Sequence, residues 1–177
     1  MIKKIILTII LINLSTIHSK ALVEVDITRG NLDPLPIAVS PLSADKATNN
    51  KLKKELDINE IGVKIAAVVE NNLKNSGLFN PLDKNAFLQK PDIAHLKPRF
   101  EDWSLIKAQA LITGKVIFKD EKLRVEFRLW DVLAGKEMMA LAFTTVPTNW
   151  RRVGHIITDK VYERLTGEKG YFDTRII

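Results

Sequence analysis

The sequence predicts an α+β fold, in which a mixed β-sheet with a three-stranded antiparallel meander carries two long helices packed on one face. Three observations lead to this prediction. Residues 123–129 alternate strictly between apolar and polar side chains, which is typical of a half-buried antiparallel strand. Strand-like segments at 109–118 and 137–146 flank it across short turns. Two further segments, beginning near residues 58 and 150, repeat apolar residues at helical spacing.

The N-terminal residues have the layout of a secretory signal peptide. A basic head at residues 1–4 precedes an apolar run from Ile5 to Ile17, and small residues follow at Ser19 and Ala21. The run is shorter than the roughly 20 residues that a membrane-spanning helix needs, although a retained N-terminal anchor is the alternative. We expect residues 1–21 to be removed after Ala21 and the mature chain to act outside the cytoplasm, peripheral to membranes.

Charge and cysteine content narrow the choice of partners only slightly. The formal net charge is +6, but Lys3, Lys4 and Lys20 lie in the predicted signal peptide, and without them 24 basic residues face 21 acidic ones. This weak basic bias is explained by solubility as well as by a polyanionic partner. The absence of cysteine excludes disulfides and thiolate nucleophiles. We expect one domain, spanning residues 22–168.

The first part of the mature chain reads as two strands and a loop. Residues 22–28 alternate apolar and polar side chains, as a strand does, and residues 29–34 have turn chemistry. Pro36 to Pro41 is a short apolar segment, consistent with a buried strand. Residues 43–55 are polar and rich in lysine, which predicts a mobile loop.

A long helix follows this loop. Asp57 and Glu60 have the spacing of a capping box, and the helix is expected to stop at Ser76 and Gly77. A short extended piece at 78–82 then leads into residues 83–102, which are expected to be irregular, with a helical turn at 103–108. The predicted buried face of the long helix consists of Ile58, Ile61, Ile65, Val68, Val69 and Leu73.

The last helix is expected to begin at Asn149 as N-cap and to end at Gly167. Its apolar face contains Val153, Ile157, Val161 and Leu165, with Trp150 and Ile156 beside them. After it, residues 171–177 resemble a strand without an obvious partner, so that we expect this segment to be poorly anchored.

Two arginines in the first turn of this helix break a local rule. The helix dipole disfavours cations there, yet Arg151 and Arg152 occupy the turn. Either both reach carboxylates elsewhere in the fold, or they brace a neighbouring domain or partner.

A search for catalytic chemistry finds no convincing site. His95 and His155 have no second histidine at metal-ligand spacing, and both are interpreted as surface or helix-edge residues. Nucleophile-elbow and phosphate-binding glycine motifs are absent, and the carboxylates of Glu101 and Asp102 look like loop residues. We therefore expect no enzyme, no metal and no cofactor. A hydrolase stays open only as a distant alternative.

Several segments resemble the TolB family, the periplasmic components of the Tol–Pal system. The most specific are NWRR at 149–152 and VYERLTGEKGYFDTR at 161–175. Further similarity, in the same order as in the family, lies at 36–39 (PIAV), 75–82 (NSGLFNPL), 110–114 (ALITG) and 127–131 (FRLWD). The resemblance implies an N-terminal α/β domain at 22–168, with residues 169–177 as a linker and the start of a β-propeller outside this chain.

The resemblance also implies partners. Members of the family contact TolA, an inner-membrane protein, through the mature N-terminal segment, and they bind the lipoprotein Pal mainly through the propeller, so Pal binding by this chain is in doubt. The family contributes to outer-membrane integrity and to invagination at division. The residues expected to form the TolA-type arm are Val23, Glu24, Val25, Asp26 and Ile27, and those expected to form an interdomain brace are Arg151, Arg152, Tyr171 and Phe172.

One alternative belongs to another functional class. The outward arginines of the alternating strand, Arg124 and Arg128, could bind an anionic small ligand or a polyanion in an independent exported domain. Export disfavours nucleic acid as that ligand, and no aromatic stacking platform accompanies the arginines.

Overall fold

The computed structural model describes residues 33–44 and 57–174 of the chain. Strands and helices alternate early, and the three longest strands follow one another before the last helix. In chain order the elements are β1 (Leu35–Val39), β2 (Ser43–Ala44), α2 (Ile58–Asn75), β3 (Phe79–Pro81), η2 (Lys84–Ala86), α3 (Pro91–Leu96), α4 (Phe100–Leu105), β4 (Ala110–Lys119), β5 (Lys122–Asp131), β6 (Lys136–Thr145), η3 (Pro147–Asn149) and α5 (Trp150–Thr166).

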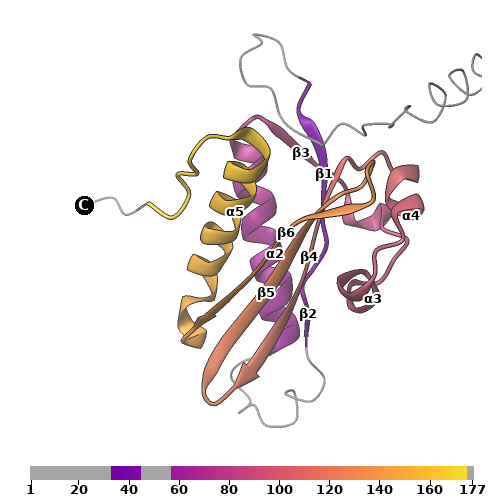
Figure 1. Ribbon diagram of the computed structural model, residues 1–177. Helices are drawn as coiled ribbons and strands as arrows, with labels where there is room; N and C mark the ends of the chain where they lie inside the picture. The colour runs from indigo at the N-terminus through magenta and orange to yellow at the C-terminus, as the bar shows by residue number, and fades with distance from the viewer. Residues whose placement is uncertain (1–32, 45–56, 175–177) are drawn as a thin grey trace, which may run out of the picture.

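These strands form one mixed sheet with the order β3-β1-β4-β5-β6 (Figure 1). β1 is parallel to both β3 and β4, whereas β4, β5 and β6 make antiparallel pairs. The two-residue strand β2 adds a short parallel pair to β4. The predicted mixed sheet with a three-stranded meander is confirmed. The predicted loop at 43–55 begins instead with β2, and its remainder from residue 45 lies outside the described residues.

The alternation in β5 buries one side of the strand. Leu123, Val125, Phe127 and Leu129 are at most 1% exposed, whereas Arg124 between them is exposed. Because successive side chains of a strand point to opposite faces, this strand packs one row of apolar groups against the helices and presents the other row outward. The division of this strand into an inward and an outward face, predicted from its alternation, is confirmed.

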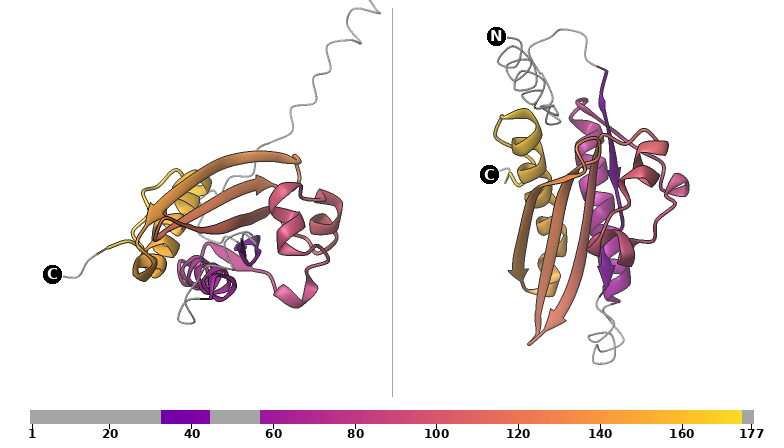
Figure 2. Two further views of the ribbon diagram at one scale, coloured as in Figure 1. Left: turned by 90° about the horizontal axis from the view of Figure 1, so that it is seen from below. Right: turned by 45° about the vertical axis from the view of Figure 1, so that its right-hand side comes forward.

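Helices α2 and α5 pack side by side on that apolar face (Figure 2). Ile65 and Val69 of α2 and Ile157 and Val161 of α5 are at most 1% exposed. The helices approach closely at Gly154, where an added Cβ would lie 2.8 Å from Cγ1 of Val68. The two predicted long helices on one face are therefore confirmed.

The short helices α3 and α4 enclose a second, smaller apolar cluster beside β1 and β4 (Figure 2). Trp103 is its largest member and is 1% exposed. Gln89 binds this cluster together, because its Oε1 accepts the Nε1–H of Trp103 at 3.1 Å and the backbone N–H of Arg99 at 3.0 Å. Its Nε2 donates to the backbone oxygen of Lys97 at 2.9 Å.

The segment 83–102 is more regular than expected. It contains η2, α3 and the start of α4, and the helical turn expected at 103–108 begins earlier, at Phe100. Pro91 interrupts no helix, since it occupies the first turn of α3, where a missing N–H is tolerated. The expectation of irregular structure over 83–102 was therefore wrong for η2, α3 and the start of α4.

The C-terminal ends of the two long helices agree with the sequence prediction, whereas the predicted side-chain cap at the start of α5 is not formed. Gly77 and Gly167 both have a φ of +76°, the left-handed conformation expected after a helix. Asn149, however, makes no side-chain capping bond. It belongs to the preceding turn η3, whose backbone already accepts the Trp150 N–H at Pro147 O.

Candidate functional site

The structure describes only one of the two groups of predicted site residues. The arm residues Val23, Glu24, Val25, Asp26 and Ile27 lie outside the described residues. The brace residues Arg151 and Arg152 lie in the first turn of α5, and Tyr171 and Phe172 lie in the segment after this helix. The site described below is therefore built on α5.

The chain reverses direction at the end of α5. Gly167 adopts the left-handed conformation, and its N–H donates to Glu163 O at 2.9 Å. A residue with a Cβ would be strained at this φ. The reversal brings residues 168–174 back alongside α5 instead of leading them away from it (Figure 1).

Asp159 holds the returning segment to the middle of α5. Its Oδ1 accepts the backbone N–H of Phe172 at 2.7 Å, and its Oδ2 accepts that of Asp173 at 3.1 Å. Gly170 passes so close that an added Cβ would collide with Cα and Oδ1 of Asp159. One carboxylate thus satisfies two consecutive backbone donors, as at a helix N-terminus.

Arg152 binds the same segment through the side-chain carboxylate of Asp173. Its Nε lies 3.0 Å from Oδ1 of Asp173, and its Nη2 lies 3.0 Å from Oδ2. This bidentate pair raises the pKa of Arg152 above its ordinary value. The partner carboxylate also offsets the unfavourable position of the cation near the helix N-terminus. For Arg152, the explanation by a carboxylate elsewhere in the fold is confirmed. Arg151 instead lies 5.5 Å from the Trp150 ring centroid.

Aromatic rings complete the attachment. The Tyr162 ring makes edge-on contacts with Phe79, Tyr171 and Phe172 at centroid distances of 6.1, 5.6 and 5.8 Å. Burial raises the pKa of the Tyr162 hydroxyl. Tyr171 and Phe172 stack at 4.5 Å, yet Tyr171 remains 51% exposed. We call the following residues the C-terminal clasp: Arg152, Asp159, Tyr162, Gly170, Tyr171, Phe172 and Asp173.

The clasp corrects one expectation. Residues 171–174 form no strand, and they are anchored by the bonds to Asp159 and Arg152. The prediction of a poorly anchored strand over 171–177 was therefore wrong for Tyr171 to Asp173. Sequence reasoning also missed Asp159, since an acidic residue on a helix looks like an ordinary solvated group.

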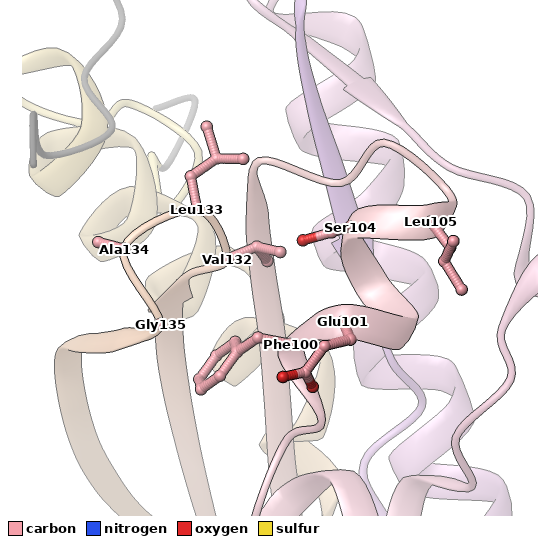
Figure 3. A pocket seen from close by; sticks show the side chains of 8 residues that line it. All are labelled: Phe100, Glu101, Ser104, Leu105, Val132, Leu133, Ala134 and Gly135. Carbon is pink, nitrogen blue, oxygen red and sulfur yellow. The ribbon is translucent and has the colours of Figure 1, made fainter.

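A shallow hollow of about 610 Å³ lies between α4 and the turn from β5 to β6 (Figure 3). The Phe100 ring points toward Gly135, while Ser104 and Val132 face each other. Its lining includes Glu101 and Ser104 as polar side chains, but no histidine or lysine that could serve as a base. Leu105 and Leu133 on its rim are 73% and 60% exposed. These side chains supply apolar surface and no recognisable catalytic arrangement.

The arginine row on β5 is already occupied by carboxylates. Arg124 Nε lies 2.8 Å from Glu126, and Arg128 Nη1 lies 2.8 Å from Glu137. The bond from Arg124 lowers the pKa of Glu126. These pairs offset the charge that an anionic ligand would need, and so they count against the alternative of an anion-binding domain.

The two histidines in the described part of the chain differ from each other. Nδ1 of His155 lies 2.9 Å from Nδ2 of Asn72, at the edge between α2 and α5, as expected. His95, by contrast, is only 5% exposed, and its Nδ1 has no hydrogen-bond partner among the described residues. Burial, followed by the charges of Arg128 and Lys115, lowers its pKa, while Glu126 opposes them. Its interpretation as a surface residue was wrong.

Two negative findings apply to residues 33–44 and 57–174. No cluster of three or more acidic, histidine or cysteine residues is placed to hold a metal ion. No helix in the same part of the chain has the length and apolarity needed to cross a bilayer.

Comparison with known proteins assigns the chain to a family. The model of the TolB amino-terminal domain matches residues 23–138. This chain belongs to the TolB family. The Tol-Pal system protein TolB of Pelagibacter ubique (strain HTCC1062) is 79% identical over 161 residues, which cover 91% of this chain and 36% of that relative. The chain thus spans about a third of the length of this TolB relative.

A solved structure supports the fold. TolB from Acinetobacter baumannii superimposes with a TM-score of 0.62 at 20% identity, over 85% of this chain and 33% of that one. At this identity the likeness concerns the fold, and it agrees with the α+β architecture predicted from sequence. The family model and the relative from Pelagibacter ubique confirm the resemblance to the TolB family seen in the sequence motifs.

Proposed function

We propose that this chain acts as the N-terminal interaction domain of a Tol–Pal system component, without catalytic activity of its own. The observation that carries the proposal is the 79% identity to the Tol-Pal system protein TolB of Pelagibacter ubique. The chain would contribute to outer-membrane integrity and to invagination of the envelope during cell division. Because the match covers 36% of that relative, the proposal concerns the domain and not the whole relative.

The proposed compartment is the periplasm. Its support is the basic head, the apolar run and the small residues of positions 1–21, which together favour export and cleavage after Ala21. Export would place Leu22 at the new N-terminus. The segment next to it would then be free to meet other envelope proteins.

The proposed partner is a TolA-like inner-membrane protein that binds the N-terminal arm, Val23 to Ile27. An extended segment can add to the edge of a partner's sheet, where backbone hydrogen bonds give affinity and alternate side chains give selectivity. In this arrangement Val23, Val25 and Ile27 enter apolar pockets of the partner. Glu24 and Asp26 remain on the solvated side and contribute mainly to the rate of encounter.

The C-terminal clasp is proposed to set the direction in which the chain continues beyond the domain. Support comes from the two bonds of Asp159 and the bidentate pair of Arg152, which together fix Phe172 and Asp173 against α5. Half-exposed Tyr171, and exposed Arg151 in the first turn of α5, offer surface for a following domain. A Pal-like lipoprotein remains a proposed partner of the longer family members, through their propeller.

The arm is tested by capture on an immobilised TolA-like protein of the same organism. Val25→Asp should abolish capture, because it places a charge in an apolar pocket, whereas Glu24→Gln should slow association and leave dissociation unchanged. Deleting residues 22–29 should abolish capture while thermal unfolding stays cooperative. Unchanged capture by Val25→Asp, or loss of folding on deletion, would contradict the proposal.

A further inference from the structure

The hollow between α4 and the turn from β5 to β6 presents apolar surface that the fold itself does not bury. Its volume of about 610 Å³ lies within the range of ligand pockets, about 300–1,000 Å³. Leu105 on α4 and Leu133 on the turn line it and are 73% and 60% exposed, and Val132 between them is buried (Figure 3). Exposed apolar side chains that gather around a hollow are typical of an interaction site.

Contacts within the fold hold both walls of this hollow in place. On the α4 side, Trp103 anchors the helix in the second apolar cluster, where it is 1% exposed. The Phe100 ring packs edge-on against the Trp130 ring at a centroid distance of 5.9 Å. On the turn side, Oδ1 of buried Asp131 accepts the backbone N–H of Ala134 at 2.8 Å. Because the walls are already ordered, a ligand would lose little affinity to ordering them.

Glu101 gives the hollow its charge. Its side chain and that of Phe100 line the hollow from the α4 side (Figure 3). The next carboxylate, Asp102, pairs with Arg99 at 2.5 Å, whereas Glu101 makes no ion pair or hydrogen bond with any other described residue. The lining contains no lysine, arginine or histidine. The hollow therefore combines apolar walls with one carboxylate that the described part of the chain leaves unpaired.

We propose that this hollow binds a segment of a partner protein in which apolar side chains flank a lysine or an arginine. The apolar side chains would cover Val132 and contact Leu105 and Leu133. The cation would pair with the carboxylate of Glu101, and its aliphatic stem would lie along the Phe100 ring, as the stems of lysine and arginine often do on apolar surface.

The charge of Glu101 is the reason for choosing a cationic partner segment. An anionic lipid surface or a polyanion would bring like charges together at this carboxylate, which is unfavourable. A wholly apolar segment would remove the carboxylate from water without supplying a partner, which also costs free energy. A segment with both chemistries avoids both costs. Because the hollow involves none of the arm residues 23–27, it would give the domain a second contact with protein partners.

Titration of the isotope-labelled full chain with short peptides, followed by two-dimensional NMR, tests this combination of chemistries. The probes are acetyl-Leu-Arg-Leu-amide, acetyl-Leu-Glu-Leu-amide and acetyl-Gly-Arg-Gly-amide. The first should shift the amide signals of Ser104 and Gly135 in a saturable way, because both residues line the hollow. The glutamate peptide should bind at least about tenfold more weakly, because it brings like charges together. The glycine peptide should also bind at least about tenfold more weakly, because it lacks apolar side chains.

Two pairs of variants assign the binding to the hollow. Glu101→Gln should weaken binding of the first peptide at least about fivefold and remove its advantage over the glutamate peptide, whereas Glu163→Gln, at an exposed carboxylate of α5, should change neither. Leu133→Ser should weaken both leucine peptides, whereas Leu96→Ser, at a position of α3 that is 77% exposed, should not. No saturable shift at Gly135, equal binding of the arginine and glutamate peptides, or equal effects of the two glutamine variants would overturn the proposal.

Discussion

The carboxylate of Asp159, in the middle of α5, accepts the backbone N–H of Phe172 at 2.7 Å, thirteen residues further along the chain. Its second oxygen accepts the N–H of Asp173 at 3.1 Å. Hydrogen bonds to an ionised group are stronger than neutral ones, so this residue fixes the segment that leaves the domain. Specific hydrogen bonds therefore hold the C-terminal clasp in the fold.

Replacing Asp159 should free this segment without unfolding the domain. Asp159→Ala removes both acceptors, each worth about 1.5–3 kcal/mol when the acceptor is charged. Amide hydrogen exchange at Phe172 and Asp173 should accelerate at least tenfold, while exchange in β5 stays slow. Glu163→Ala, which removes an exposed carboxylate of the same helix, is the control. Equal exchange in both variants would contradict this role.

Arg152 and Asp173 should act as one unit. Arg152→Gln and Asp173→Asn are each expected to accelerate exchange at Tyr171 and Phe172, because each removes the bidentate pair. The double variant should add little to either single one, as expected for residues in direct contact. The effect should shrink at high salt, since the pair is exposed and therefore screened. Additive effects would show that the two residues work separately.

Much of the fold could be predicted because its elements repeat simple patterns. The alternation from Leu123 to Leu129 fixes which face of β5 is buried, and the helical spacing from Val153 to Leu165 does the same for α5. Both patterns arise because one side of the element packs against a single layer, so the buried positions recur at the period of the strand or helix. The left-handed glycines Gly77 and Gly167 likewise follow from local geometry.

The clasp could not be predicted in the same way. Its hydrogen bonds join residues that share no local sequence pattern. The strand-like composition of residues 171–177 indicated a strand, and nothing in the local sequence indicates that Asp159 accepts the backbone N–H of Phe172. Asn149 occupies the N-cap position as predicted but makes no side-chain bond, because it belongs to the preceding turn η3 and its backbone, with φ −89° and ψ 11°, is not extended as that of a capping residue usually is. His95 looked like a surface residue because the packing of its own helix, α3, against β4 and β2 cannot be read from the local sequence. The arm at 23–27 remains a prediction.

His95 should make stability depend on pH. Its pKa in the folded chain is lowered from 6.5, first by burial and then by Arg128 and Lys115, with Glu126 opposing. Protonation is thus less favourable in the folded than in the unfolded state. The stabilising effect is present above pH 6.5 and is lost as the pH falls through the folded pKa.

The measurement is urea unfolding between pH 7.5 and pH 5. The free energy of unfolding of the unmodified chain should fall over this interval, and that of His95→Leu should fall less. A variant that keeps the full slope would show that other groups cause it.

Gly154 should be intolerant of a side chain. Gly154→Ala places a Cβ 2.8 Å from Cγ1 of Val68, a branched side chain with little freedom to move. Overpacking of this kind costs about 1–3 kcal/mol in the free energy of unfolding. Adding Val68→Ala should recover part of the loss, although Val68→Ala alone destabilises. Denaturant unfolding of the unmodified chain, the two single variants and the double variant gives the coupling energy between the two positions. A coupling energy near zero would contradict the close approach of Gly154 and Val68.

Gln89 should contribute more to the free energy of unfolding than its position in a connecting segment suggests. It is 5% exposed, and its side chain satisfies the indole N–H of Trp103, the backbone N–H of Arg99 and the backbone oxygen of Lys97. Gln89→Leu keeps the volume but leaves these three groups without that partner. Each unsatisfied buried group costs about 1–3 kcal/mol, so we expect a total loss of about 2–5 kcal/mol after partial relaxation.

Urea unfolding followed by far-UV circular dichroism measures the loss, and a second substitution identifies its source. Trp103→Phe removes the indole N–H, so the pair Gln89→Leu with Trp103→Phe should cost less than the sum of the two single changes. Leu88→Ala, at a neighbouring position that is 61% exposed, should change stability by less than about 0.5 kcal/mol. If Gln89→Leu were as mild as Leu88→Ala, the buried hydrogen bonds would not stabilise the second cluster, and its packing alone would hold α3 and α4 in place.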